Sequence, residues 1–191
     1  MKNQKELDSQ LQTKITLAYA TKTLIERFDF ETKTIWDPFA CNGGDIAKTC
    51  IDAGYDVFST NVVEFNWKLD MKLDYFECSK MPSRTGLSDD ETDDFAIVTH
   101  PPYGFENKFF RNTFSDFGVQ PKTCCVFIPV KYLEDIESYT AVYSKVKPCK
   151  ILIYPGKFEN NIEGVGSYMW LCFNQDSYYT EIAKPEIEWV L

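Results

Sequence analysis

Short apolar runs alternate with amphipathic stretches along this chain, and this alternation constrains the fold more than any other feature. Runs with the apolar and β-branched content of strands are predicted at residues 34–36, 55–63, 72–76, 95–99, 123–129, 150–154 and 167–173. Stretches with helical spacing lie at residues 45–53, 105–117 and 132–146, and Gly54 follows the first of them. Strands and helices in this order predict an α/β fold with a doubly wound, mostly parallel sheet and right-handed crossovers.

The start of the chain predicts an N-terminal helical cap, because apolar residues recur with helical spacing over residues 7–28. The 191 residues are about the length of one domain, and residues 1–191 are expected to form a single domain. No run approaches the roughly 18 apolar residues of a membrane helix, and residues 1–12 are polar and charged. We therefore expect a soluble, cytoplasmic protein that does not associate with membranes.

The seven cysteines are an odd number and lack the paired short spacings that zinc sites use. Cys124 and Cys125 are adjacent on a predicted strand, where neighbouring side chains face opposite sides of the sheet. We expect buried, reduced thiols and predict no metal site.

Two segments that follow predicted strands carry the functional signal. They are Asp37-Pro38-Phe39-Ala40-Cys41-Asn42-Gly43-Gly44 and His100-Pro101-Pro102-Tyr103. Ligands of open α/β sheets bind outside the carboxyl ends of the strands, which is where both segments are expected. Together they resemble the two signature motifs of the S-adenosylmethionine-dependent amino-methyltransferases, which methylate exocyclic amines of bases, adenine above all. The resemblance implies a Rossmann-like methyltransferase fold with a mostly parallel seven-stranded sheet and a C-terminal antiparallel strand.

The first segment resembles the part of the family that binds the cofactor S-adenosylmethionine. The residues that match the family pattern are Asp37, Pro38, Phe39, Ala40 and Gly43. A carboxylate and backbone amides at such a turn suit the charged methionine end of the cofactor. Cys41 stands where the family has a glycine that lets the cofactor approach the backbone. The cysteine side chain either narrows the cofactor-binding turn or points away from it.

Two later positions complete the cofactor residues that the resemblance implies. Asn61 stands where the family usually has an acidic residue that accepts hydrogen bonds from the ribose, and an amide makes that contact without a charge. Asp74 and Tyr75 resemble the element that bonds the adenine amine and packs against its ring. The alternative for this pair is an ordinary strand end with a core aromatic residue.

The second segment resembles the element that activates the target amine, whose lone pair is delocalised into the adenine ring. The family localises that lone pair with the side chain of the first motif residue and the carbonyl of the next proline, and the final aromatic ring stacks on the base. By this match the catalytic residues are His100, Pro101, Pro102 and Tyr103. The family has Asp, Asn or Ser where this chain has His100, its only histidine. Neutral imidazole accepts through one nitrogen and imidazolium only donates, so a working acceptor, a changed substrate and a non-catalytic site are all open readings.

A base in a duplex must be flipped out to reach such a site, and Tyr103, Phe105 and Lys108 are the predicted substrate-binding residues. Trp170 and Tyr168 are further candidates for stacking on the base. The formal net charge of −9, part of it in residues 87–94, opposes tight binding of DNA by this chain alone. We therefore expect weakly held nucleic acid, and a basic protein partner would suit the acidic segment.

The sequence thus favours a methyltransferase that acts on an exocyclic amine, adenine in DNA or RNA. Compact members of the family are common in phages and mobile elements, which the length of this chain would suit. One alternative is a protein glutamine N-methyltransferase, since a glutamine amide poses the same problem of a weak nucleophile. The other is a catalytically degenerate protein of this fold that acts as a binding or inhibitory partner, because Cys41, Asn61 and His100 all depart from the family pattern.

Overall fold

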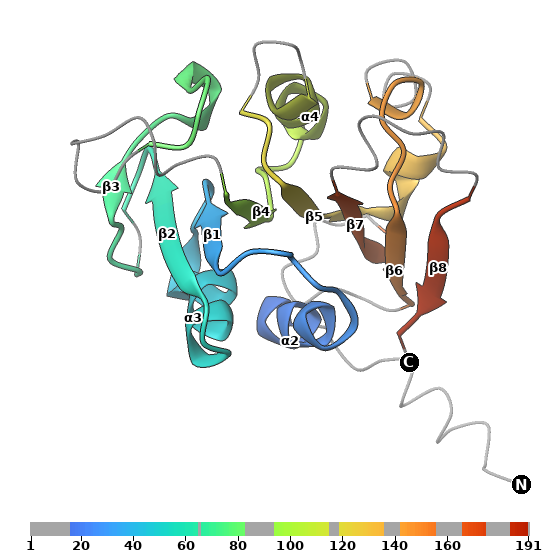
Figure 1. Cartoon of the computed structure of the whole chain (residues 1–191), viewed down its shortest axis with the longest axis horizontal. Coiled ribbons are helices and arrows are strands. Elements are labelled where there is room, and N and C mark those ends of the chain that lie inside the picture. The colour runs from blue at the N-terminus through green and yellow to red at the C-terminus, as the bar shows by residue number, and fades with distance from the viewer. Residues whose placement is uncertain are drawn as a thin grey trace, which may run out of the picture.

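A computed structural model of the chain describes residues 16–64, 66–82, 94–114, 119–135, 142–155, 166–174 and 184–190. Within these ranges eight strands form one sheet in the order β3-β2-β1-β4-β5-β7-β6-β8 (Figure 1). The strands are β1 (Thr34–Asp37), β2 (Asp56–Asn61), β3 (Met71–Lys72), β4 (Ala96–Thr99), β5 (Thr123–Pro129), β6 (Lys150–Tyr154), β7 (Tyr168–Asn174) and β8 (Glu186–Trp189).

The chain builds the sheet outward from its middle in both directions. It runs from β1 to β2 and β3 on one side, then returns to place β4 and β5 on the other side of β1. These five strands are parallel, whereas β7 pairs antiparallel with both β5 and β6. This arrangement confirms the prediction of a doubly wound, Rossmann-like methyltransferase fold. The strand order reverses between β1 and β4, which is where a sheet of this type opens a crevice for ligands.

Helices cover both faces of the sheet (Figure 1). α2 (Leu17–Arg27) and α3 (Asp45–Asp52) pack on one face, and α4 (Glu106–Phe114) packs on the other. Three short 3₁₀ helices, η1 (Asn42–Gly44), η2 (Tyr75–Glu77) and η3 (Val130–Leu133), lie in the described connections. No helix in the described ranges is long and apolar enough to cross a membrane.

The alternation of side chains along the strands divides the core into two layers. On β4, Ala96 and Val98 join the layer under α2 and α3, while Ile97 joins the layer under α4. β5 is buried along its whole length, as expected of a strand covered on both faces. Both layers are rich in aromatic side chains, so most of the aromatic residues in the described ranges serve the core rather than a surface.

The structure differs from the sequence prediction at two strands. The strand expected at residues 72–76 is shorter and earlier, because the side chain of Asp74 accepts a hydrogen bond of 2.9 Å from the Phe76 amide and begins the 3₁₀ helix η2. β8 was not predicted and extends the expected sheet by one strand beside β6, with which it is parallel. In β8 the usual burial of apolar side chains is reversed. The apolar Ile187 and Trp189 are exposed, while the carboxylate of Glu188 pairs with Arg27 of α2 at 2.6 Å.

Several expectations fall partly outside the described residues. The predicted N-terminal cap is seen as α2, and its remainder at residues 7–15 lies outside. The helix predicted at 132–146 begins as the 3₁₀ helix η3 instead, and residues 136–141 lie outside. The acidic segment 87–94 is described only at Asp94, and the loop between β6 and β7 only at its two ends.

Candidate active site

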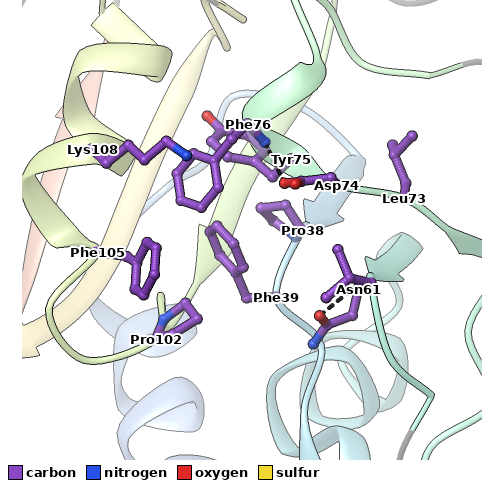
Figure 2. Close-up of a pocket in the computed structure, with 11 residues that line it drawn as sticks. Pro38, Phe39, Asn61, Leu73, Asp74, Tyr75, Phe76, Pro102, Phe105 and Lys108 are labelled. Carbon is purple, nitrogen blue, oxygen red and sulfur yellow. Dashed lines mark hydrogen bonds between the residues drawn. The ribbon is translucent and has the colours of Figure 1, made fainter.

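A pocket of about 240 Å³ opens at the carboxyl ends of β1, β2, β3 and β4 (Figure 2). It lies at the reversal of strand order, as the fold requires of a ligand crevice. The loops after all four strands contribute to its lining, which consists of Pro38, Phe39, Asn61, Val62, Leu73, Asp74, Tyr75, Phe76, Pro102, Phe105 and Lys108. Rings form much of the wall, and a few polar groups interrupt them, which is the composition of a small-molecule site.

The two motif segments meet at this pocket. Thr99, the last residue of β4, donates its hydroxyl to Oδ1 of Asp37, the last residue of β1, over 2.7 Å. Immediately beyond these residues, Pro38 and Phe39 from the first segment and Pro102 from the second line the same cavity. The expectation that both segments lie side by side at one edge of the sheet is therefore confirmed.

Asp37 is a buried carboxyl group without an ion pair in the described part of the chain. Besides the Thr99 hydroxyl, the Phe39 amide donates to the same oxygen at 3.4 Å. Burial raises the pKa of Asp37 to about 7, and these two hydrogen bonds only partly oppose the increase. The group is consequently poised between its neutral and charged forms near neutral pH, and a cation bound beside it would favour the carboxylate.

Asn61 connects the end of β2 to the loop that follows β1 through a side-chain hydrogen bond. Its Nδ2 donates to the Ala40 carbonyl at 3.0 Å, and its Oδ1 accepts from the Val62 amide at 2.7 Å. The Ala40 amide in turn donates to the Thr60 carbonyl at 3.1 Å. Asn61 lines the pocket as the sequence predicted, and it also has a structural task that the sequence did not indicate. Ala40 is buried and serves this connection through its backbone.

Asp74, which precedes η2, and Tyr75 and Phe76 within it line the pocket in different ways (Figure 2). Asp74 caps η2 through Oδ1. Tyr75 is almost fully buried, and its hydroxyl lies 2.7 Å from that of Thr113 on α4, so only part of its ring borders the cavity. Phe76 is more exposed and stacks on Phe105 with ring centroids 5.8 Å apart. Phe76 is therefore the ring that η2 offers to a ligand.

Lys108 completes this side of the pocket. Its Nζ lies 4.0 Å from the centre of the Phe76 ring, within the range of a cation–π contact. The lysine and the stacked rings of Phe76 and Phe105 together form a wall suited to a flat, electron-rich ligand. Phe105 and Lys108 were predicted to bind substrate, whereas here they lie on the same cavity as the predicted cofactor residues.

His100 lies just after β4 and points toward β5 and β7. Its Nδ1 is 2.7 Å from the carbonyl oxygen of Phe127, and its ring packs edge-on against the rings of Phe127 and Tyr168. A carbonyl can only accept, so Nδ1 carries the hydrogen and Nε2 is the acceptor nitrogen of the neutral ring. Burial lowers the pKa of His100 below its ordinary 6.5, although the bond to Phe127 acts in the opposite direction. The neutral form is therefore favoured at neutral pH.

Tyr103, like Pro102 before it, is exposed. Its side chain is 45% exposed, and its hydroxyl lies 2.5 Å from Nζ of Lys131, which also sits 4.5 Å from the centre of the ring. Pro101, by contrast, is buried. Of the four residues predicted to be catalytic, only Pro102 lines the pocket; His100, Pro101 and Tyr103 lie around the turn beside it.

The turn between β1 and α3 is held by two glycines in the left-handed conformation, Gly43 at φ +81° and Gly44 at φ +60°. The ring of Trp67 lies directly on Gly44, since a Cβ there would be 2.1 Å from a ring carbon. Cys41 and Gly43 are not among the pocket's lining residues. Burial, with the nearby charges of Asp37 and Asp45, raises the pKa of Cys41 to about 11, so its sulfur remains a protonated thiol.

The structure adds three lining residues to the predicted site and excludes one predicted stacking residue. Val62, Leu73 and Phe76 line the pocket, and their signal in the sequence was only their place beside Asn61 and Asp74. Trp170, which the sequence offered as a stacking residue, is fully buried and donates its ring N–H to the Ala20 carbonyl at 3.0 Å. It belongs to the core under α2 and cannot reach a substrate.

No protein-family model and no curated protein matches the chain. Among solved structures, the chain is similar to a proposed class I S-adenosylmethionine-dependent methyltransferase from Listeria monocytogenes, with a TM-score of 0.46 and 14% identity over 91% of this chain. The chain covers 62% of the length of that protein.

Proposed function

We propose that this protein is an S-adenosylmethionine-dependent methyltransferase that acts on an exocyclic amine, with adenine in DNA or RNA as the target. The observation that carries the proposal is the meeting of the two motif segments: Thr99 bonds to Asp37, and Pro38 and Pro102 border one cavity. A methyl donor beside the first segment and an amine beside the second would then be within reach of each other. Holding two reactants in this way is a large part of catalysis in such transfers.

The residues of the pocket suit the nucleoside half of S-adenosylmethionine. A volume of about 240 Å³ is below the roughly 300–1,000 Å³ of sites that enclose drug-sized ligands, so a nucleoside is a better match than the whole cofactor. Phe39, Phe76 and Phe105 would pack on the adenine ring, and Asp74 and Asn61 offer oxygens at the cavity edge. When bound, the cofactor supplies a methyl group made electrophilic by its sulfonium sulfur.

Asp37 would hold the methionine end of the cofactor through its ammonium group. A buried carboxyl with a pKa near 7 gains most from a cation, because the cation stabilises the charged form that burial disfavours. The Thr99 hydroxyl keeps the carboxylate oriented at the end of β1. These two residues would therefore bind and orient the cofactor without taking part in bond making.

His100 would accept a hydrogen bond from the target amine through Nε2. This contact would keep the amine's lone pair on the nitrogen atom instead of delocalised into the ring of the nucleobase. The Phe127 carbonyl fixes the required tautomer, and burial keeps the ring neutral. When nitrogen takes the methyl group it loses a proton, and the neutral imidazole is a base able to receive it. Tyr103 would stack on the target base, as in the motif that the segment resembles.

The proposed nucleic-acid substrate would be held weakly by this chain alone, since its net charge is −9 and Lys108 and Lys131 are the lysines beside the site among the described residues. Binding of oligonucleotides should therefore be weak and, with so few phosphate contacts, should change only modestly as salt is raised. A basic protein partner that supplies phosphate contacts would relieve this weakness.

The test is calorimetric titration with S-adenosylmethionine, followed by transfer of a radiolabelled methyl group to DNA, RNA and protein pools. Binding with label in nucleic acid, and N6-methyladenine on hydrolysis, is the expected result. Label in protein glutamine instead would move the proposal to the glutamine alternative. Absence of cofactor binding at millimolar concentration would overturn the enzyme proposal and favour a degenerate protein that acts as a binding partner.

A further inference from the structure

Glu106, the first residue of α4, is a buried carboxylate beside the second motif segment. Only 2% of its surface is exposed. Its Oε2 accepts two hydrogen bonds of 2.7 Å, one from the Gly104 amide and one from the Tyr132 hydroxyl. Gly104 follows Tyr103 directly and has φ +87°, so the carboxylate holds the turn at a residue in the left-handed conformation. One oxygen thus links the turn after β4 to the 3₁₀ helix η3 after β5.

The linked segments carry the residues around which the substrate site is proposed. Lys131 neighbours Tyr132 on η3, and its Nζ contacts both the hydroxyl and the ring of Tyr103. Tyr168, whose ring contacts His100, also lies near the carboxylate: burial and then the charges of Glu106 and Tyr103 raise its pKa to about 12. Glu106 therefore holds the turn that carries Tyr103, and its charge also acts on Tyr168, the ring that contacts His100.

Burying this carboxylate is unfavourable for the fold by itself. No cation pairs with Glu106 in the described part of the chain. Its position in the first turn of α4 provides some compensation through the helix dipole, and its two hydrogen bonds satisfy only one of its oxygens. An apolar side chain of similar volume would be cheaper to bury. A buried acid that fixes a turn beside a proposed site points to a role in positioning.

We propose that Glu106 is the positioning residue of the second motif segment: by holding the Gly104 amide and the Tyr132 hydroxyl, it fixes Tyr103 in the orientation that receives the target base. The proposal rests on the proposed methyltransferase function. The proposed role of Glu106 depends on the position of its acceptor oxygen and not on its charge. A side chain that keeps an acceptor oxygen at the same place should therefore preserve the orientation of Tyr103. Glu106→Gln keeps such an oxygen, and Glu106→Ala removes it.

The first measurement is amide hydrogen exchange of a peptide that spans residues 101–106. This measurement does not require that the protein transfer a methyl group. Losing the acceptor of the Gly104 amide should speed exchange of this peptide about tenfold in Glu106→Ala, whereas peptides of β4 and β5 stay protected. Glu106→Gln should exchange as the wild type does. Tyr132→Phe removes a single donor and should give a smaller increase, which keeps the test decisive if Glu106→Ala does not fold. Glu134→Ala, an exposed acid at the end of η3, is the matched control and should change nothing.

The second measurement separates substrate positioning from cofactor binding. In Glu106→Ala, kcat/KM for methyl transfer should fall about tenfold or more, while the dissociation constant for S-adenosylmethionine stays within about twofold. Glu106→Gln should recover most of the lost rate. Unchanged exchange or unchanged kcat/KM in the alanine variant would overturn the inference, and so would a glutamine variant as poor as the alanine one. If the wild type transfers no methyl group, the proposed function fails, while the exchange data still decide whether Glu106 fixes the turn.

Discussion

The hydroxyl of Thr99 donates to Oδ1 of Asp37 across 2.7 Å, which joins the carboxyl ends of β4 and β1 where the strand order of the sheet reverses. The bond joins the two motif segments where they begin, because Asp37 is the first residue of one segment and Thr99 directly precedes the other. It also explains why a carboxyl group so deeply buried has a defined orientation. The chemistry of Asp37 is therefore the most informative property of the site to test.

Asp37→Asn should make the fold more stable at neutral and alkaline pH. The pKa of the carboxyl is about 7 in the folded protein and 3.8 in an unfolded chain, so the folded state holds the proton more tightly. The free energy of unfolding of the wild type must then fall as pH rises from about 4 to about 7. A difference of about 3 pKa units corresponds to about 4 kcal/mol of lost stability above that range. Denaturant unfolding at pH 5 and pH 8 should show an advantage of Asp37→Asn that grows with pH, and an equal advantage at both would contradict it.

Binding of S-adenosylmethionine should tighten as pH rises through about 7. The ammonium of the cofactor would favour the charged form of Asp37, so at lower pH binding must release the proton that burial retains. Calorimetry in buffers of different ionisation enthalpy should detect that release near neutral pH. Asp37→Asn should bind weakly and without this pH dependence.

Thr99→Val should shift the pH dependence of cofactor binding to higher pH. The hydrogen bond from Thr99 is the larger of the two that lower the pKa of Asp37 against the effect of burial. Its removal leaves the carboxylate less stabilised, and the proton should be lost only at a higher pH. The midpoint of affinity against pH, compared between the variant and the wild type, measures this change directly. A midpoint that stays in place would show that Thr99 does not control the ionisation of Asp37.

His100→Ala should lose most of the methyl transfer and keep the cofactor. Removal of a positioned proton acceptor costs about 100-fold or more in kcat. Cofactor binding should survive because His100 does not line the pocket proposed for the cofactor. His100→Asn restores a side-chain acceptor oxygen and should recover part of the rate. In the wild type, kcat should fall on acidification at a pH below the ordinary 6.5 of imidazole, because burial lowers the pKa of His100. Full activity in His100→Ala would refute the role of acceptor.

The sequence was most informative where a residue's environment is set by its neighbours along the chain. β5 and β6 have the predicted ends because a run of apolar residues between polar turns has few alternatives in a covered sheet. The meeting of the two motif segments was also predictable, since parallel neighbouring strands bring their carboxyl ends to one edge. This rule placed Asp37 and Pro102 at that edge, whereas Asn61 was expected there from the family resemblance.

Features that depend on pairing between distant segments were not predictable. β8 has exposed apolar residues, and its glutamates form ion pairs with Lys150 of β6 and Arg27 of α2. Its sequence therefore lacks the apolar pattern of a buried strand and resembles that of a loop. The tautomer of His100 depends on the Phe127 carbonyl, whose distance is set by the register of β4 and β5. Local side-chain capping also overrode strand propensity at Asp74, where one hydrogen bond begins a 3₁₀ helix.

Gly44→Ala should destabilise the fold more than Gly54→Ala, although both glycines have a positive φ, of +60° and +89°. A Cβ at Gly44 would lie 2.1 Å from the Trp67 ring, whereas a Cβ at Gly54 would meet nothing within 4 Å. We expect a loss of about 1–2 kcal/mol at Gly54 from backbone strain alone, and about 2–4 kcal/mol at Gly44. Denaturant unfolding measures both.

The contact with Trp67 is isolated by adding Trp67→Ala to Gly44→Ala. Trp67 also donates its ring N–H to Ser59 at 3.1 Å, so Trp67→Ala alone should cost stability. If the ring is what Gly44 accommodates, the glycine substitution should cost about 1–2 kcal/mol in the Trp67→Ala background, the same strain as at Gly54. Strictly additive losses in the double variant would mean that the tight packing of Trp67 on Gly44 does not limit which residue can stand there.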